Sequence, residues 1–231
     1  MVVKPQIDKF DQYIPYPQNL KLLLRATDGT TSGMKDFSGY GRVVTNSTGA
    51  TGSTTEIKIN PYSMFFDGTD DVISVPDSAD WDFGTGDFGI SFYSKFTATN
   101  IDYFISEIGR YSESKGILIY WDQAAGAFKL SVNGAGYLSY TWASKNTNWN
   151  HIYIVRLSGV IYIYVNGISL GSNSNTSNIT GSTYGISLGN NTAVSGLFYG
   201  GYINEYLVWK GSVPSINQLY PQNKPFSFRR A

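Results

Sequence analysis

The clearest hydrophobic pattern along the chain is a period of two in residues 87–96. The apolar positions are Phe88, Ile90, Phe92 and Phe96. Small or polar residues alternate with them, and Ser94 is the one polar residue on the apolar face. Successive side chains of a β-strand point to opposite faces of its sheet, so this pattern predicts a strand with one face in the core.

Short apolar runs separated by turn residues extend from LKLLLR at 20–25 to GYINEYLVW at 201–209. Between them lie RVVT, EIKI, YSMFFD, DVISV, DYFISEIG, KGILIYW, AFKLSVN, NHIYIVRL, VIYIYVNG and YGISLG. Such spacing predicts many short strands, as in a sandwich or jelly roll. The Asn166-Gly167 pair between two runs predicts a two-residue hairpin turn, because both residues tolerate a positive φ.

These elements predict an all-β fold, a two-sheet antiparallel β-sandwich with one short C-terminal helix. The helix is expected within residues 213–220, where apolar residues follow at helical spacing after a proline. We expect an extended N-terminal arm at 1–19, where three prolines interrupt any periodicity, the sandwich at 20–220, and a C-terminal tail at 221–231.

Composition agrees with this fold and narrows the partners. Aromatic residues make up 16% of the chain, and aromatic side chains suit pleated, half-buried surfaces. There is no Cys, which excludes disulfides and thiolate chemistry. Basic and acidic residues balance at 17 each, so we expect neither a nucleic-acid nor a membrane partner. The first residues lack the apolar core of a signal peptide, so we expect synthesis and retention in the producing cell.

The order of motifs resembles the laminin-G-like branch of the concanavalin A-like lectin and glucanase superfamily. Four segments carry the resemblance: SMFFDGTDDVISVPDSADWDFGTGDFGISFYSKF at 63–96, WNHIYIVRLSGVIYIYVNGISLG at 149–171, YGISLGNN at 184–191 and GYINEYLVWKGSVPSINQLY at 201–220. It implies a jelly roll of two curved sheets with loops available for ligands. It implies no single activity, because the superfamily includes lectins, calcium-dependent recognition domains, glycosidases and virion surface proteins.

The residues needed for catalysis are not arranged as a glycosidase requires. Glycosidases of this superfamily carry two carboxylates on alternate positions of one strand. The four glutamates stand singly: they are Glu56, Glu107, Glu113 and Glu205. His151 is the only histidine and lies within an apolar strand, where a structural role is more common than that of a catalytic base. We therefore expect no catalytic residues and no enzyme activity.

Seven of the 17 acidic residues fall within residues 67–87, where there is no Lys or Arg. Ca²⁺ takes six to eight hard oxygens from such loops, but Asp-Gly and Pro-Asp-Ser are also ordinary turn sequences. Turns are the favoured interpretation, and no cofactor is required. If an ion is bound, Ca²⁺ on Asp67, Asp70 and Asp71 is the first candidate, with Asn190 or Asn191 as a distant partner.

A third group of candidates is aromatic. Sugars stack on exposed Trp and Tyr rings, and five aromatic residues lie in or beside predicted loops: Trp121, Tyr137, Tyr140, Trp142 and Trp149. Glycan or interface contact is the candidate role of these residues, and a protein interface or the core, where such rings are also enriched, is favoured over glycan stacking. Residues 157–209 hold no Lys or Arg and a single acid, Glu205, which favours a contact surface and a homo-oligomer.

These observations lead to one hypothesis and one alternative. Chains of this kind look like bacteriophage structural proteins, so the hypothesis is a non-catalytic capsid decoration protein on the virion surface. The major capsid protein or other virion proteins would be its partners, with Arg229 and Arg230 in a tail that docks on the assembly. The alternative is a lectin-like module that binds surface glycans for host adhesion, with calcium assisting.

Overall fold

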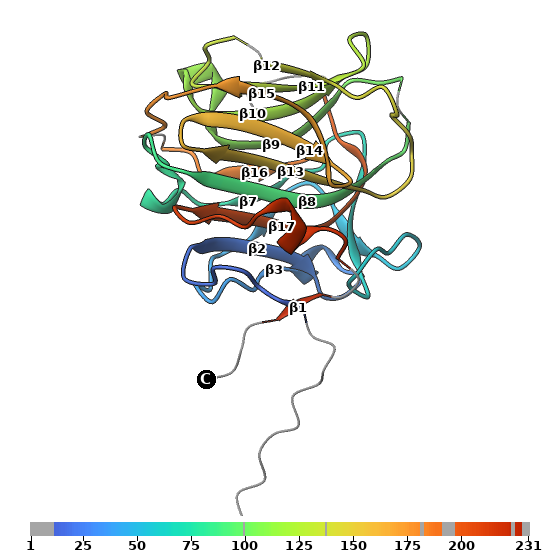
Figure 1. Ribbon diagram of the computed structural model, residues 1–231. Helices are drawn as coiled ribbons and strands as arrows, with labels where there is room; N and C mark the ends of the chain where they lie inside the picture. The colour runs from blue at the N-terminus through green and yellow to red at the C-terminus, as the bar shows by residue number, and fades with distance from the viewer. Residues whose placement is uncertain are drawn as a thin grey trace, which may run out of the picture.

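The computed structural model describes residues 12–98, 100–136, 138–180, 183–190, 197–222 and 225–227. Two antiparallel sheets lie face to face, as predicted, with a short parallel pair beside them (Figure 1). None of the helices among these residues is long and apolar enough to cross a membrane.

The first sheet has nine strands. Its path runs β15 (Ile168–Ser174), β14 (Val160–Val165), β13 (Asn150–Leu157), β8 (Phe88–Phe96), β17 (Gly200–Lys210), β2 (Leu20–Ala26) and β3 (Met34–Asp36), with β6 (Ser63–Asp67) on β17 and β5 (Thr51–Ser53) on β6. The apolar face of β8 lies in the core as predicted, and the buried Ser94 hydroxyl lies 2.6 Å from the Tyr199 hydroxyl there. The opposite face is buried as well, at Gly89, Ser91 and Tyr93, so the strand is not half-buried. Asn166 and Gly167, with φ of 51° and 80°, form the predicted turn between β14 and β15.

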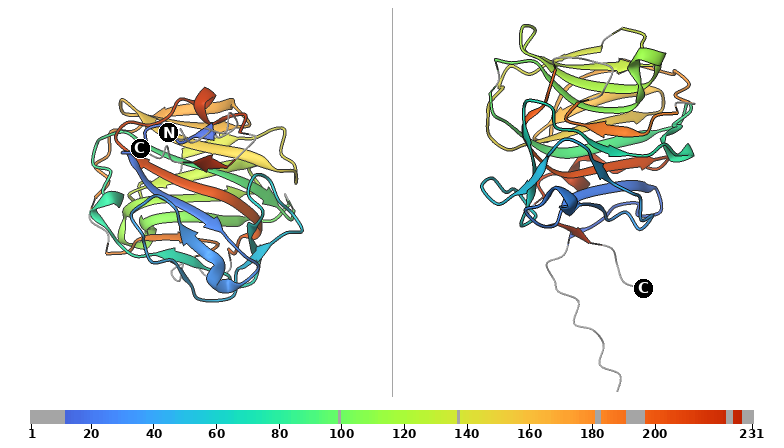
Figure 2. Two further views of the ribbon diagram at one scale, coloured as in Figure 1. Left: turned by 90° about the horizontal axis from the view of Figure 1, so that it is seen from below. Right: turned by 180° about the vertical axis from the view of Figure 1, so that it is seen from behind.

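The second sheet has seven strands. Its order is β12 (Leu138–Thr141), β11 (Ala127–Val132), β10 (Lys115–Asp122), β9 (Tyr103–Arg110), β16 (Ile186–Leu188), β7 (Ile73–Val75) and β4 (Thr45–Asn46). One large cluster of buried side chains fills the space between the two sheets. Figure 1 is viewed from the side of the nine-stranded sheet, and the right view of Figure 2 is from the opposite side.

A second, smaller apolar cluster covers the outer face of the nine-stranded sheet. Ile14, Phe226 and Leu219 of the short helix α1 (Ile216–Leu219) pack there on side chains of β2, β13 and β17. Ile14 is buried there, and the Trp209 indole donates to the Pro15 carbonyl at 3.0 Å. Residues 12–19, expected as an extended arm, therefore pack against the sandwich.

The two ends of the described chain meet. β1 (Gln12–Tyr13) pairs in parallel with β18 (Phe226–Ser227), at the lower edge of the sandwich in Figure 1. The predicted helix is confirmed but is shorter than residues 213–220, because Pro214 precedes it and a Ser215–Gln218 capping box fixes its first turn. Short 3₁₀ turns lie at Thr31–Gly33, Ala79–Trp81 and Tyr111–Glu113.

A buried arginine holds the loops at one end of the sandwich. Arg156 in β13 is fully buried, and its guanidinium donates to the carbonyls of Gly84, Gly86 and Ser177 at 2.6 to 2.9 Å. The same two loops are also joined by two backbone hydrogen bonds between Gly84 and Ile179, at 2.8 and 3.0 Å. The planar fork of arginine suits several acceptors at once, so Arg156 adds to this bridge and holds both loops to β13.

Candidate functional site

A cavity of about 430 Å³ lies on the outer face of the seven-stranded sheet and is a candidate site. We call it the Glu107 cavity. Its lining includes Ser74, Glu107, Arg110, Tyr184 and Ser187, with Ser47, Val72 and Asp77 at its margins. Neighbouring residues of β7 and β16, such as Ile73 and Ile186, point into the core. Ser74 and Ser187 therefore point outward, into the cavity.

The floor of the Glu107 cavity is one row of residues across the sheet. Ser74 pairs with Ser187, Ser187 pairs with Glu107, and Glu107 pairs with Leu118 of β10. Cross-strand partners have their Cβ atoms about 5 Å apart. Two hydroxyls and a carboxylate are thus set at regular intervals along a line perpendicular to the strands.

Glu107 is the least expected member of this row. Its side chain is only 3% exposed, and one carboxylate oxygen accepts a hydrogen bond of 2.6 Å from the Tyr111 backbone N–H. A buried carboxylate is costly unless hydrogen bonds satisfy it. The pairing of β9 with β10 slips by one residue at Ile119/Tyr120, so Ile105 and Ser106 both face the core side and Glu107 is turned outward.

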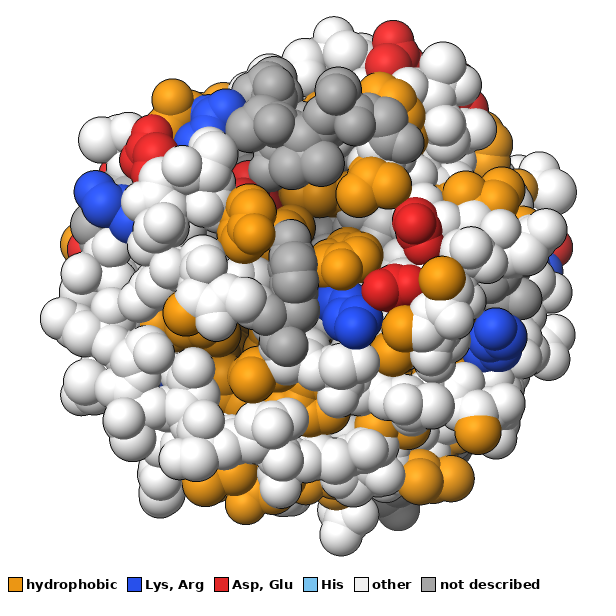
Figure 3. Space-filling model, turned by 90° about the horizontal axis from the view of Figure 1, so that it is seen from above, with side chains coloured by type: hydrophobic (Ala, Val, Ile, Leu, Met, Phe, Trp, Pro, Cys, Tyr) orange, Lys and Arg blue, Asp and Glu red, His pale blue; other side chains and the backbone are white. Residues whose placement is uncertain are grey.

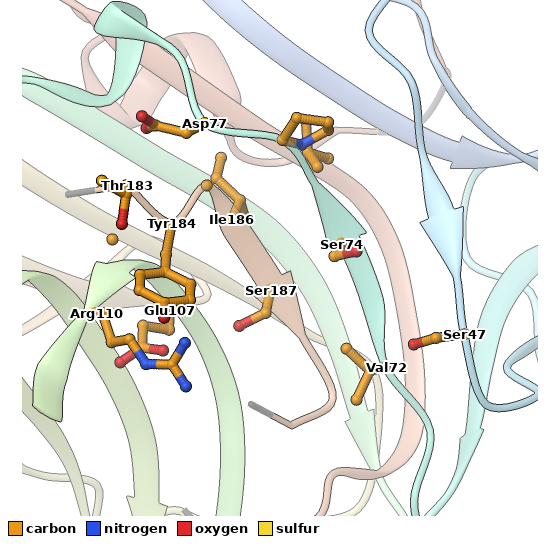
Figure 4. Close-up of a pocket in the computed structure, with 14 residues that line it drawn as sticks. Ser47, Val72, Ser74, Asp77, Glu107, Arg110, Thr183, Tyr184, Ile186 and Ser187 are labelled. Carbon is orange, nitrogen blue, oxygen red and sulfur yellow. The ribbon is translucent and has the colours of Figure 1, made fainter. Parts of the chain in front are cut away.

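Arg110 and Tyr184 form one wall of the cavity. The Arg110 guanidinium carbon lies 3.7 Å from the centre of the Tyr184 ring, which is 42% exposed. Figure 4 shows both side chains over Glu107 at one end of the cavity, with Ser47 and Val72 at the other end. An arginine stacked on one face of a tyrosine holds the ring in place and leaves its remaining surface for a ligand.

Gly185 explains how Tyr184 comes so near to the sheet. A Cβ at this position would lie 1.9 Å from the Val75 carbonyl oxygen. The Gly185 carbonyl also accepts a hydrogen bond of 2.8 Å from the Gly109 N–H. Only glycine permits this approach, which places Tyr184 directly beside β9 and β7.

The structure brings the predicted cation ligands together. Each of Asp67, Asp70 and Asp71 offers one carboxylate oxygen, and these oxygens lie within 4.8 Å of one another. Asp71 is buried and accepts a hydrogen bond of 2.8 Å from the Asp67 N–H. Burial raises the pKa of Asp71, and the neighbouring Asp67 and Asp70 charges raise it further. Asn190 is buried and Asn191 lies outside the described residues; calcium binding stays a prediction.

Most of the aromatic residues predicted to contact a glycan or a partner lie in the core and do not line the Glu107 cavity. Trp121, Tyr140 and Trp142 are 0 to 4% exposed and pack in the main core, where no ligand reaches them. These three residues belong to the core, which was favoured together with an interface, and not to a glycan contact, because Trp121 shares the inward face of its strand with Ile117 and Ile119. Tyr137 lies outside the described residues. Trp149 is half-buried beside Tyr202, with ring centres 6.3 Å apart.

His151 is a buried structural residue, as predicted. Its Nε2 lies 2.9 Å from the Ser91 hydroxyl, and its ring stacks on Tyr220 and lies against Tyr93. Burial lowers the pKa of His151 to about 3, and the Lys58 charge contributes. Among the described residues, no carboxylate hydrogen-bonds this histidine, so it lacks the orienting group of a catalytic triad.

The sequence analysis missed the Glu107 cavity altogether. Its residues come from three strands that are far apart in the chain and from the loops beside them, and short strands such as Ile73–Val75 and Ile186–Leu188 give little pattern to read. One signal was present, since Glu107 is the single charge within the apolar segment YFISEIG. A lone acid in a predicted core strand points to a satisfied or functional carboxylate.

Comparison with known proteins identifies the sequence pattern. A family model described as the concanavalin A-like lectin/glucanases superfamily, of the laminin-G type, matches residues 67–215, which is 149 of the 231 residues. No curated protein matches the sequence.

The fold is similar to that of botulinum neurotoxin binding domains. Botulinum neurotoxin type C, whose cell entry is described as dependent upon interaction with two ganglioside molecules, has a TM-score of 0.67 at 15% identity. The match covers 86% of this chain and 49% of that one. The neurotoxin DC binding domain in complex with rat synaptotagmin II has a TM-score of 0.69 at 16% identity, covering 88% and 51%. The receptor binding domain of neurotoxin D has 0.67 at 14%, covering 88% and 52%. The chain thus spans about half the length of these proteins.

Proposed function

The chain belongs to the concanavalin A-like lectin/glucanases superfamily, and on this premise we propose that it is a non-catalytic glycan-binding module that takes its ligand in the Glu107 cavity. One observation carries the proposal. The floor of the cavity is a single row of two hydroxyls and a carboxylate, from Ser74 through Ser187 to Glu107, beside the exposed ring of Tyr184.

This arrangement suits the two surfaces of a sugar. The hydroxyls of a pyranose need donors and acceptors, and serine supplies both while an ionised carboxylate accepts. The C–H face of the same ring packs on an aromatic side chain, for which Tyr184 is available. Pockets with an apolar body and a few fixed polar groups are the usual form of small-ligand sites.

The structural neighbours support the proposal without deciding it. The description of neurotoxin type C states that its cell entry depends on two ganglioside molecules, and gangliosides carry glycans. A second neighbour is the binding domain of botulinum neurotoxin DC in complex with SialylT. At about 15% identity the likeness concerns the fold, so the residues of the Glu107 cavity carry the argument for this chain.

The carboxylates of the cavity do not form the pair that a glycosidase needs. Besides Glu107, the acid among its described lining residues is Asp77. Asp77 follows the end of β7 and lies two strands away from Glu107, so the two acids do not stand on alternate positions of one strand as in glycosidases of this superfamily. We therefore infer binding without hydrolysis.

The test is a glycan array followed by calorimetric titration of the best glycan. Tyr184→Ala and Glu107→Gln should each weaken binding by about tenfold or more, since each removes one contact worth roughly 1.5 kcal/mol. Tyr40→Ala is the matched control, because Tyr40 is also exposed with an arginine over its ring but belongs to the β3–β4 connection. Failure of every glycan to bind, or unchanged binding in both cavity variants, would overturn the proposal.

The virion hypothesis stays a prediction. The partners expected there are the major capsid protein and further copies of the chain. No surface feature of the described residues distinguishes these partners from others. Electron microscopy of native particles with a labelled antibody would test it directly.

A further inference from the structure

A second cavity, of about 290 Å³, adjoins the first on the same face of the seven-stranded sheet. We call it the Tyr120 cavity; the residues that matter are Asp102, Phe104, Tyr111, Leu118, Tyr120 and Asp122. Phe104 and Leu118 are 1% and 5% exposed and form an apolar floor, while Tyr111 and Tyr120 are half-buried. The described residues that line it include no lysine or arginine.

The two cavities share a boundary. Leu118, on the floor of the Tyr120 cavity, is the cross-strand partner of Glu107 on the floor of the other. Tyr111 lines the Tyr120 cavity, and its backbone N–H donates to the Glu107 carboxylate. Neighbouring strands are about 4.8 Å apart, so one ligand of two or more linked units can occupy both cavities.

The chemistry of the two cavities differs. The carboxylates of Asp102 and Asp122 are held in place by the Gln123 and Ala125 backbone N–H groups, at 2.6 and 2.9 Å. Burial raises the pKa of Tyr120, and the negative charges of Asp122 and Asp102 raise it further. Lys129 approaches Asp122 to 3.7 Å, and its side chain is 19% exposed. Among the described residues that line the cavity, no basic side chain faces Asp102.

We propose that the Tyr120 cavity is a subsite for a positively charged amine, so that the glycan bound in the Glu107 cavity carries an amino sugar as its neighbouring unit. Aromatic faces and carboxylates together are the surroundings that favour an ammonium group, and an apolar floor accepts the sugar carbons. This inference rests on the proposed function and names the class of its ligand.

The experiment compares two oligosaccharides of equal length by calorimetric titration. One is an oligomer of glucosamine with free amines, and the other is its N-acetylated form. We expect the free-amine oligomer to bind roughly tenfold more tightly at low salt. Asp102→Asn/Asp122→Asn should remove this preference and leave the affinity for the acetylated oligomer unchanged, whereas Glu113→Gln, an exposed acid outside both cavities, should keep it.

A second variant should change the preference in the opposite direction, which a folding defect would not do. Lys129→Met removes the basic group that pairs with Asp122, so the preference for the free amine should increase. Equal binding of both oligomers by the unmodified chain, or a preference that survives in the double aspartate variant, would overturn the amine subsite and leave the glycan site intact. If neither oligomer nor any other glycan binds, the proposed function fails and the subsite with it.

Discussion

The Arg25 guanidinium and the Glu205 carboxylate form a buried ion pair between β2 and β17. Glu205 has a φ of 52°, at a point where β17 slips relative to β8, and its side chain has no exposed surface. The same carboxylate accepts from Gln222 Nε2 and from the Phe226 backbone N–H, while Arg25 also donates to the Phe226 carbonyl at 2.7 Å. Two charges therefore hold the C-terminal segment on the sheet.

Glu205→Ala should destabilise the protein by about 3 kcal/mol or more, because it leaves the Arg25 charge uncompensated and frees the Phe226 N–H. Urea unfolding measures the free energy, and amide exchange of residues 225–227 should accelerate at the same time. The control is Glu113→Ala at an exposed site, which should change stability by less than about 0.5 kcal/mol. Equal stability of the two variants would show that the network contributes little.

Acidification should destabilise the fold through His151. Burial lowers its pKa to about 3, whereas an unfolded histidine titrates near 6.5, so the unfolded chain binds more protons between these values. The contribution of His151 to the free energy of unfolding is therefore fully present above pH 6.5 and decreases as the pH falls toward 3. From pH 7 to pH 5 this residue should cost about 2 kcal/mol.

His151→Gln isolates that contribution, since the amide retains a hydrogen-bonding group for Ser91 but does not titrate. The difference in unfolding free energy between the parent and the variant should shrink as the pH falls from 7 to 5. A constant difference over this range would mean that His151 is not kept neutral by burial.

Calcium should stabilise the protein if Asp67, Asp70 and Asp71 bind it. A ligand that binds only the folded state at tenfold excess over its Kd adds about 1.4 kcal/mol, which raises the melting temperature of a chain of this size by about 3–6 °C. Chelation should reverse the shift and Asp71→Asn should abolish it. Asp77→Asn, an exposed acid outside the cluster, is the control that should retain it. No shift in the parent would contradict the prediction.

The tryptophans should differ sharply in their effect on stability. Trp142 is buried and stacks on Phe128 with ring centres 5.7 Å apart, so Trp142→Ala should cost about 3–5 kcal/mol. Trp149 is half-buried, so Trp149→Ala should cost clearly less. Differential scanning calorimetry of both variants checks the order, and a larger loss at Trp149 would contradict the placement of these side chains.

Local sequence pattern predicted the strands well. The inward-facing positions of β8 and the Asn166-Gly167 turn are decided by neighbouring residues, and both appear as expected. The same rule applied to β10 assigns Trp121 to the face of Ile117 and Ile119, so its burial was predictable even though it lies beside a loop. Position near a loop is a poor guide to exposure when strand parity points inward.

The candidate site could not be predicted in the same way. Ser74, Ser187 and Glu107 meet through the register of three strands, and Glu107 faces outward only because of the slip between β9 and β10. Neither register nor slip is encoded in one segment alone. Glu205, the single acid of segment 157–209, is buried, so the expected charge-poor surface of this segment does not depend on it, and the contact surface stays a prediction. Figure 3, viewed from the edge with β12 and β15, shows acidic and basic side chains beside the hollow near the centre of that face.

The parallel pairing of β1 with β18 sets how the molecule bears mechanical force. In a parallel pair, tension applied to the chain before residue 12 and after residue 227 pulls the two strands in opposite directions along their length. The hydrogen bonds between them are then loaded together in shear, not opened one after another. The backbone of Phe226 in β18 is also bonded to Arg25 and Glu205, so a pull at the two ends enters the sandwich through this strand pair and this ion pair together.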